Sequence, residues 1–175
     1  MPIVKSLTVS VVILLAGCTG LPDGIDPVSD LDVERYQGTW YEIARLDHSF
    51  EEGLSNVTAE YSVQDDGSIR VINRGFSEEE GQWEEAEGRA VFVEDEANGH
   101  LKVSFFGPFY ASYVVFRLDE DYRFAYITGY DRDYLWFLSK TPTVDDEALE
   151  DFKDVASAKG FDLEELIVVD QSRNR

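Results

Sequence analysis

The sequence predicts an all-β protein: an eight-stranded antiparallel up-and-down β-barrel with one C-terminal α-helix packed outside it and a short ninth strand. Two observations indicate this fold class. Eight short segments alternate between apolar and polar residues, and turn signals such as Asp66-Gly67 and Asn98-Gly99 separate several of them. Helical spacing of apolar residues begins only after Pro142. Eight strands in chain order close most simply as a barrel with room for one small ligand, and an open sandwich is the alternative.

The expected strands follow one another from residue 39 onward, after a short helical turn within residues 31–37. We expect strands over residues 39–47, 56–64, 69–76, 86–94, 100–106, 111–118, 122–129 and 134–140, with an acidic loop over 77–85. Successive side chains of a strand point to opposite faces. In the first strand, Trp40 and Glu42 should therefore face one side and Arg45 the other.

The end of the chain predicts one helix and a last strand. Acidic residues at 145–147 suit the positive end of a helix dipole. The apolar residues Leu149, Phe152 and Val155 then recur at three- and four-residue spacing, and Gly160 is typical of a helix C-cap. An apolar run over 166–169 predicts the ninth strand.

Residues 1–17 have the composition of a lipoprotein signal peptide. Residues 7–15 form an apolar run that is too short to span a bilayer. Small residues then precede Cys18, the single cysteine of the chain, as in the bacterial lipobox, which implies cleavage before Cys18 and its acylation. An ordinary signal peptide with a chance cysteine is the alternative. Residues 18–30 are rich in Gly, Pro and Asp, and we expect them to tether the acylated cysteine to a barrel domain over 31–175.

Charge and motif content exclude several classes of function. The chain carries 15 basic and 36 acidic residues, a net charge of −21, which argues against nucleic acid as a partner. The barrel segment has no cysteine, no serine elbow, no phosphate loop and no metal-ligand spacing, and His48 and His100 belong to no cluster. We therefore expect no enzyme activity, no metal and no cofactor. The alternatives are an enzyme, a haem or coloured-isoprenoid carrier, or an interaction protein with a filled barrel.

Three segments resemble the signatures of the lipocalin family. They are residues 38–41 with Asp32 and Tyr36 before them, Asp121-Tyr122 in a turn, and residues 138–142 at the end of the eighth strand. Segments 38–45, 102–110 and 131–136, together with the lipobox, are similar to the bacterial outer-membrane members of that family. The resemblance covers residues 31–170. It departs in one place, since Lys140 stands where the third signature usually has arginine.

The resemblance implies a closed base and an open ligand-binding lumen. Gly38, Trp40 and Lys140 would close one end of the barrel, with Lys140 across the indole of Trp40. The lumen would be lined by apolar and aromatic side chains with a few polar groups. These are Tyr61, Val71, Asn73, Phe92, Phe105, Tyr113, Val115, Tyr134, Trp136 and Leu138. Tyr126 has no clear side, and we place it in the lumen only as a weaker candidate.

The implied function is to store or transport fatty acids or lysophospholipids, in maintenance of the cell envelope. Thr19 after the acylated Cys18, in place of aspartate, implies sorting to the bacterial outer membrane, with the barrel in the periplasm. The expected partners are the lipid ligand and the membrane that holds the anchor. The resemblance is also compatible with a homodimer.

Overall fold

The computed structural model describes residues 19–94 and 98–174, so that the predicted signal peptide and Cys18 lie outside the described residues. Its strands are β1 (Gly38–Arg45), β2 (Leu54–Val63), β3 (Ile69–Ser77), β4 (Gln82–Phe92), β5 (His100–Phe106), β6 (Phe109–Leu118), β7 (Phe124–Thr128), β8 (Leu135–Ser139) and β9 (Ile167–Val168). Its helices are α1 (Val33–Tyr36), α2 (Asp146–Ala158) and the 3₁₀ helix η1 (Ser172–Asn174). Within the described ranges, no helix is long and apolar enough to cross a membrane.

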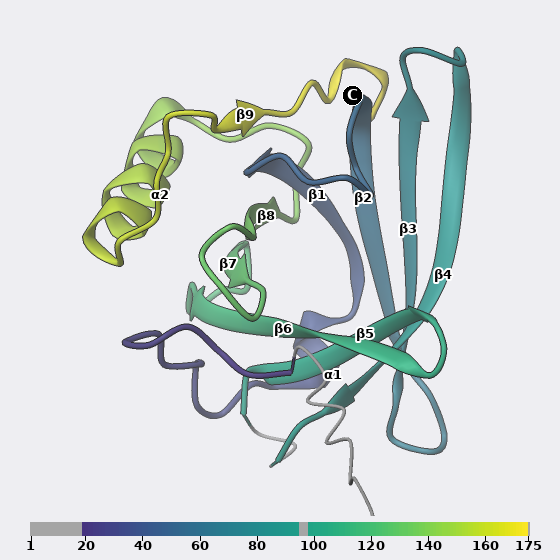
Figure 1. Cartoon of the computed structure of the whole chain (residues 1–175), viewed down its shortest axis with the longest axis vertical. Helices are drawn as coiled ribbons and strands as arrows, with labels where there is room; N and C mark the ends of the chain where they lie inside the picture. Colours follow the sequence, from purple (N-terminus) through teal and green to yellow (C-terminus); the bar gives the residue numbers. More distant parts are fainter. Residues whose placement is uncertain (1–18, 95–97, 175) are drawn as a thin grey trace, which may run out of the picture.

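The first eight strands form a closed antiparallel barrel (Figure 1). Each strand pairs with the next from β2 to β8, β8 pairs with β1, and β1 pairs with β2. The predicted barrel, its outer helix and its ninth strand are confirmed. Because consecutive strands run in opposite directions, their connections alternate between two ends of the barrel. We call the end with α1 and the β2–β3, β4–β5 and β6–β7 connections the base, and the other end the mouth.

The C-terminal segment completes the barrel wall near the mouth. The ladder between β1 and β2 covers only the first half of β1, and β9 pairs with the last residues of β1. The Gln171 side chain is 3% exposed, and its Nε2 donates to the carbonyls of Glu42 and Val57 at 2.8 and 2.9 Å. Since a buried carbonyl needs a donor, Gln171 replaces the missing ladder bonds between the two strands.

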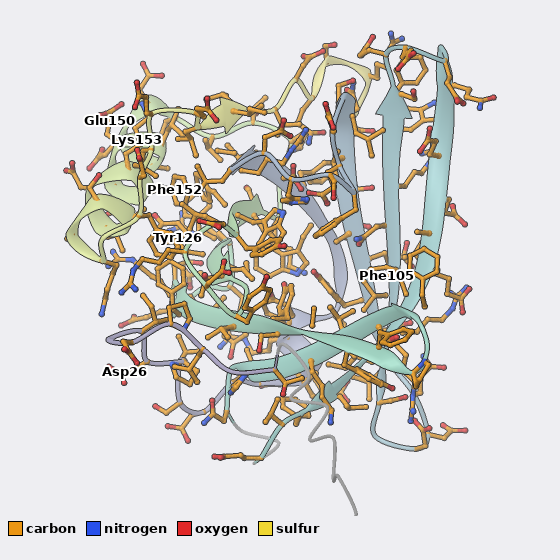
Figure 2. All side chains as sticks on the ribbon, viewed as in Figure 1. Asp26, Phe105, Tyr126, Glu150, Phe152 and Lys153 are labelled. Atoms are coloured by element: carbon orange, nitrogen blue, oxygen red, sulfur yellow. The ribbon has the colours of Figure 1, made fainter. Side chains whose placement is uncertain are left out.

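Helix α2 covers the outside of the barrel with the apolar stripe that its sequence predicts. Phe152 is fully buried, and its ring stacks on Phe137 of β8 at a centroid distance of 5.0 Å. Figure 2 shows Phe152 between the helix and the barrel, with Glu150 and Lys153 on the outer side of α2. Tyr126 of β7 also contacts Phe152, at 5.0 Å. The placement of Tyr126 in the lumen is therefore wrong.

The acidic loop expected over residues 77–85 is too long, because Ser77 ends β3 and residues 82–85 belong to β4, which leaves 78–81 as the turn. The β3–β4 hairpin extends beyond the other strands (Figure 1) and leaves its acidic side chains in water. Cross-strand pairs hold it together. Arg70 forms two hydrogen bonds to Glu87, and the Arg74 guanidinium lies 3.8 Å from the ring centroid of Trp83.

A bulge in β1 changes the direction in which Arg45 points. The register of β1 against β8 shifts between Glu42 and Ala44. Ile43 and Ala44 consequently both pack in the cluster under α2, and Arg45 lies opposite Trp136 of the inner cluster. The prediction that Arg45 faces away from Glu42 is wrong, because one extra residue moves every later side chain to the other face.

The segment expected to act as a tether lies along the outside of the barrel. Ile25 is 1% exposed and belongs to the cluster under α2. The Val28 amide donates to the Val115 carbonyl at 2.9 Å, and its carbonyl accepts from the Gly99 amide at 2.8 Å. In Figure 1 this N-terminal segment, drawn in purple, passes close to β6. Little of residues 19–30 is therefore a free linker.

Candidate functional site

The base of the barrel is filled by Trp40, which is fully buried. Its Nε1 donates to the Tyr36 carbonyl at 2.8 Å. The Lys140 ammonium lies 4.4 Å from the ring centroid of Trp40 and donates to the Gln37 carbonyl at 2.5 Å. Burial lowers the pKa of Lys140. Gly38 has a φ of +89°, which favours glycine and lets the chain turn from α1 into β1 under this ammonium.

Three tyrosines above Trp40 satisfy one another's hydroxyl groups. The Tyr113 hydroxyl lies 2.7 Å from that of Tyr36 and 2.9 Å from that of Tyr61. Burial is the main cause that raises the pKa of all three phenols. The trio is therefore neutral and forms a polar layer that needs no partner from a ligand.

The apolar middle of the barrel brings together eight of the ten predicted lumen residues. Those in or packed against this cluster are Tyr61, Val71, Phe92, Phe105, Tyr113, Val115, Trp136 and Leu138. Phe105, labelled in Figure 2, lies directly over Gly88, where a Cβ would come within 2.8 Å of its ring. The absent side chain of Gly88 thus makes room for the Phe105 ring.

The other two predicted lumen residues lie outside this cluster. Asn73 belongs to β3, and its buried Oδ1 has no hydrogen-bond partner among the described residues. Tyr134 lies in the β7–β8 connection at the mouth, where its ring stacks on Phe50 at 6.1 Å and on Trp136 at 6.1 Å. Tyr134 therefore contributes to the entrance, while Asn73 offers an unpaired acceptor.

A buried charged cluster that the sequence analysis missed lies between the apolar middle and the mouth. Arg45 is 1% exposed, and its Nη1 donates to Glu42 Oε1 at 2.8 Å. Its Nη2 donates to the carbonyls of Glu51 and Leu54 at 2.9 and 3.2 Å. Arg45 Nε has no hydrogen-bond partner among the described residues. Arg45 thus ties the β1–β2 connection to the barrel wall, and its Nε lies 3.9 Å from Asp47 Oδ1.

Glu51 reaches inward from the β1–β2 connection and joins this cluster. Its side chain is buried, and its Oε2 accepts from Trp136 Nε1 at 3.0 Å. His48 Nε2 lies 2.9 Å from the same oxygen. The ring of His48 packs at a tilt against that of Phe50, with the centroids 3.9 Å apart. The connection therefore places a polar group inside the mouth and an aromatic group over it.

The electrostatics of the cluster are set by the Arg45–Glu42 ion pair and by the neighbouring Glu51 carboxylate. Burial raises the pKa of Glu42, the Glu51 carboxylate raises it further, and Arg45 opposes both effects. A protonated Glu42 leaves Arg45 with the Asp47 carboxylate, 3.9 Å from its Nε, as an ion-pair partner, which avoids an uncompensated buried charge. The cluster therefore presents charges of both signs between the apolar middle and the mouth. Across the described ranges, no group of His, Cys, Asp and Glu side chains is arranged to hold a metal ion.

Comparison with known proteins decides the family. The family profile described as "Lipocalin-like domain" matches residues 31–171. The chain belongs to the lipocalin family. This lipocalin is 57% identical to the outer membrane lipoprotein Blc of Vibrio cholerae serotype O1 over 160 residues, which cover 91% of this chain and 94% of that protein. It is 47% identical to Blc of Escherichia coli strain K12, over 98% and 97% of the two chains.

A solved structure shows the same fold for this lipocalin. Insecticyanin from the tobacco hornworm Manduca sexta superposes with a TM-score of 0.70, at 23% identity, over 89% of this chain and 88% of that one. At this identity the likeness concerns the fold alone. The resemblance to lipocalins drawn from the sequence is confirmed, and the lipocalin groups with the bacterial outer membrane lipoproteins.

Proposed function

We propose that this lipocalin is a lipid carrier, not an enzyme, held at the outer membrane by an acylated Cys18. It stores or transports one acyl lipid inside its barrel. The observation that carries the proposal is the layered interior, with an apolar middle between a closed base and a buried charged cluster at the mouth. An acyl chain buried there gains roughly 25 cal/mol per Å² before ordering costs. The names of the bacterial relatives support the anchoring.

The charged cluster favours a lysophospholipid over a free fatty acid. A fatty-acid carboxylate would bring one more carboxyl group to a cluster in which Glu42, Asp47 and Glu51 already lie around or beside Arg45. A zwitterionic head group instead offers a cation to Glu51 and a phosphate to Arg45 Nε, which donates no hydrogen bond and lies 3.9 Å from the half-exposed Asp47 carboxylate. We therefore assign the head group to the mouth and the acyl chain to the apolar middle.

The proposal is tested by displacement of a fluorescent fatty acid from delipidated protein carrying Cys18→Ser. We expect both palmitate and a C16 lysophosphatidylcholine to displace the probe, with the lysolipid effective at lower concentration. A protein that binds neither lipid contradicts the carrier function. A coloured preparation, with visible absorbance that survives purification, would instead point to a haem or isoprenoid carrier.

A pair of substitutions tests the assignment of the head group to the charged cluster. Glu51→Gln keeps an acceptor for Trp136 Nε1 but removes the negative charge, so it should reduce the preference for the lysolipid. Glu79→Gln, on the exposed β3–β4 turn, makes the same chemical change outside the barrel and should leave the preference unaltered. Equal preference in wild type and Glu51→Gln would exclude the charged cluster as the head-group site.

A further inference from the structure

Exposed aromatic side chains gather at the mouth of the barrel. Five of the seven large hydrophobic side chains exposed among the described residues lie in or beside the mouth connections. They are Phe50, Trp83, Phe106, Phe109 and Tyr130. Phe106 and Phe109 are the most exposed, at 81% and 75%, and they are register partners on either side of the β5–β6 turn. An apolar hairpin tip of this kind indicates a surface that covers it.

The start of the described chain is fixed to the two strands that carry this tip. The Gly20 carbonyl accepts a hydrogen bond from Ser112 Oγ of β6, and the Thr19 backbone is hydrogen-bonded to His100 of β5. Ser112 follows the tip residue Phe109 by three residues along β6, about 10 Å at the usual rise of a strand, and His100 precedes Phe106 by six residues along β5, about 20 Å. One peptide unit of about 3.8 Å joins Thr19 to Cys18. The first described residues therefore lie on the same two strands as the aromatic tip, roughly 10–20 Å from it, and Cys18 itself lies outside the described residues.

We propose that the hairpin 106–109 is a membrane-docking element. In the anchored protein, its two phenylalanines insert into the interfacial region of the bilayer that holds the acyl chains of Cys18. This rests on the proposed acylation, because the anchor brings the tip to the lipid surface. A lipid anchor alone leaves a barrel free to rotate, whereas a second apolar contact fixes its orientation. The mouth then faces the surface from which a lipid ligand enters.

The negative charge at the mouth favours docking to a zwitterionic lipid surface over an anionic one. The chain has a net charge of −21, and the exposed residues Glu78, Glu79 and Glu80 lie in the β3–β4 turn at the same end as the hairpin. Anionic head groups would repel this end, while a zwitterionic surface allows the phenylalanines to insert. The partner of the hairpin is therefore a bilayer rich in zwitterionic phospholipid.

The experiment measures the depth of a spin label on the full acylated protein in phosphatidylcholine vesicles. Gly107→Cys places a labelling site at the tip, where a Cβ meets nothing within 4 Å. Acylation blocks Cys18, the only native cysteine, so the new thiol takes the nitroxide. Ser157→Cys, on the exposed side of α2, is the matched control. We expect the label at 107 to lie about 5–10 Å inside the interface and the label at 157 to remain in water.

A second variant separates insertion from mere proximity to the anchor. Phe106→Ser with Phe109→Ser should return the label at 107 to water, while the anchor keeps the protein on the vesicles. In the unacylated Cys18→Ser protein, each Phe→Ser change should weaken vesicle binding about tenfold.

Three results overturn the proposal. One is equal water exposure of the labels at 107 and 157. Another is dipolar broadening between labels at 107, which would show that a second copy covers the tip. The third is an unacylated Cys18, detected by mass spectrometry of the N-terminus, which would also contradict the proposed anchoring. Because label depth requires no bound ligand, failure of docking is distinguishable from failure of lipid binding in the displacement assay.

Discussion

Replacing Arg45 by methionine should destabilise the barrel by about 3–5 kcal/mol at pH 7.5, the usual effect of removing one partner from a buried ion pair. Arg45 is 1% exposed and forms ion pairs with Glu42 at 2.8 Å and with Asp47 at 3.9 Å. It is also a donor to the Glu51 and Leu54 carbonyls. For a domain of this size, the loss corresponds to a decrease in Tm of about 6–20 °C.

The effect of Arg45→Met should depend on pH with a definite sign. Burial and Glu51 raise the pKa of Glu42, so the folded state binds this proton more tightly than the unfolded chain. Stability from this group is present below the unfolded pKa of about 4.3 and is lost as pH rises towards the folded pKa. Without Arg45 the pKa of Glu42 rises further. The variant should therefore lose stability more steeply above pH 4.5, by up to about 1.4 kcal/mol per pH unit.

Urea unfolding followed by tryptophan fluorescence from pH 4.5 to 8 measures both effects. Adding Glu42→Gln to Arg45→Met should recover part of the loss and flatten its pH dependence, because the amide does not titrate. Arg70→Met, which removes an exposed pair with Glu87, should leave the unfolding midpoint unchanged. If Arg45→Met unfolds like Arg70→Met at pH 7.5, the account of the charged cluster is wrong.

Two further substitutions test the packing around the barrel. Phe152→Ala removes the ring that stacks on Phe137 and should lower the free energy of unfolding by about 3–5 kcal/mol in the same urea assay. A loss below about 1 kcal/mol would contradict the packing of α2 against the barrel. Gly88→Ala places a Cβ 2.8 Å from the Phe105 ring and should destabilise the protein by about 1–3 kcal/mol. Gly107→Ala, with open space around its Cβ, should leave stability unchanged. Equal effects of the two substitutions would refute the close contact between Gly88 and Phe105.

Much of the fold follows from local patterns in the sequence. Val71 follows Ile69, and Val115 follows Tyr113, at the two-residue period of a strand, and all four lie in or against the inner cluster. Leu135 and Phe137 face α2, as the alternation of β8 with an inward Lys140 predicts. These elements are predictable because a regular ladder keeps the two-residue period of its side chains over its whole length.

The charged cluster was missed because it depends on irregular structure. The bulge after Glu42 breaks the period, and Glu51 enters the barrel from a connection that has no period. One signal was present. Without a bulge, Arg45 would lie on the same face as Ile43, in the apolar layer under α2. Burying an unpaired charge in that layer would be costly, so the sequence indicates that the alternation breaks before Arg45. Gln171 gave no such signal, since its partners are backbone carbonyls of β1 and β2.

Native mass spectrometry tests the central claim, that the barrel holds one lipid, most directly. The protein would be purified without detergent exchange, and any ligand released in the gas phase would be identified by its mass. The account predicts one acyl lipid per barrel, restored to a delipidated sample by C16 lysophosphatidylcholine. A wild-type barrel that has only the mass of the chain, before and after incubation with lysolipid and palmitate, would contradict it.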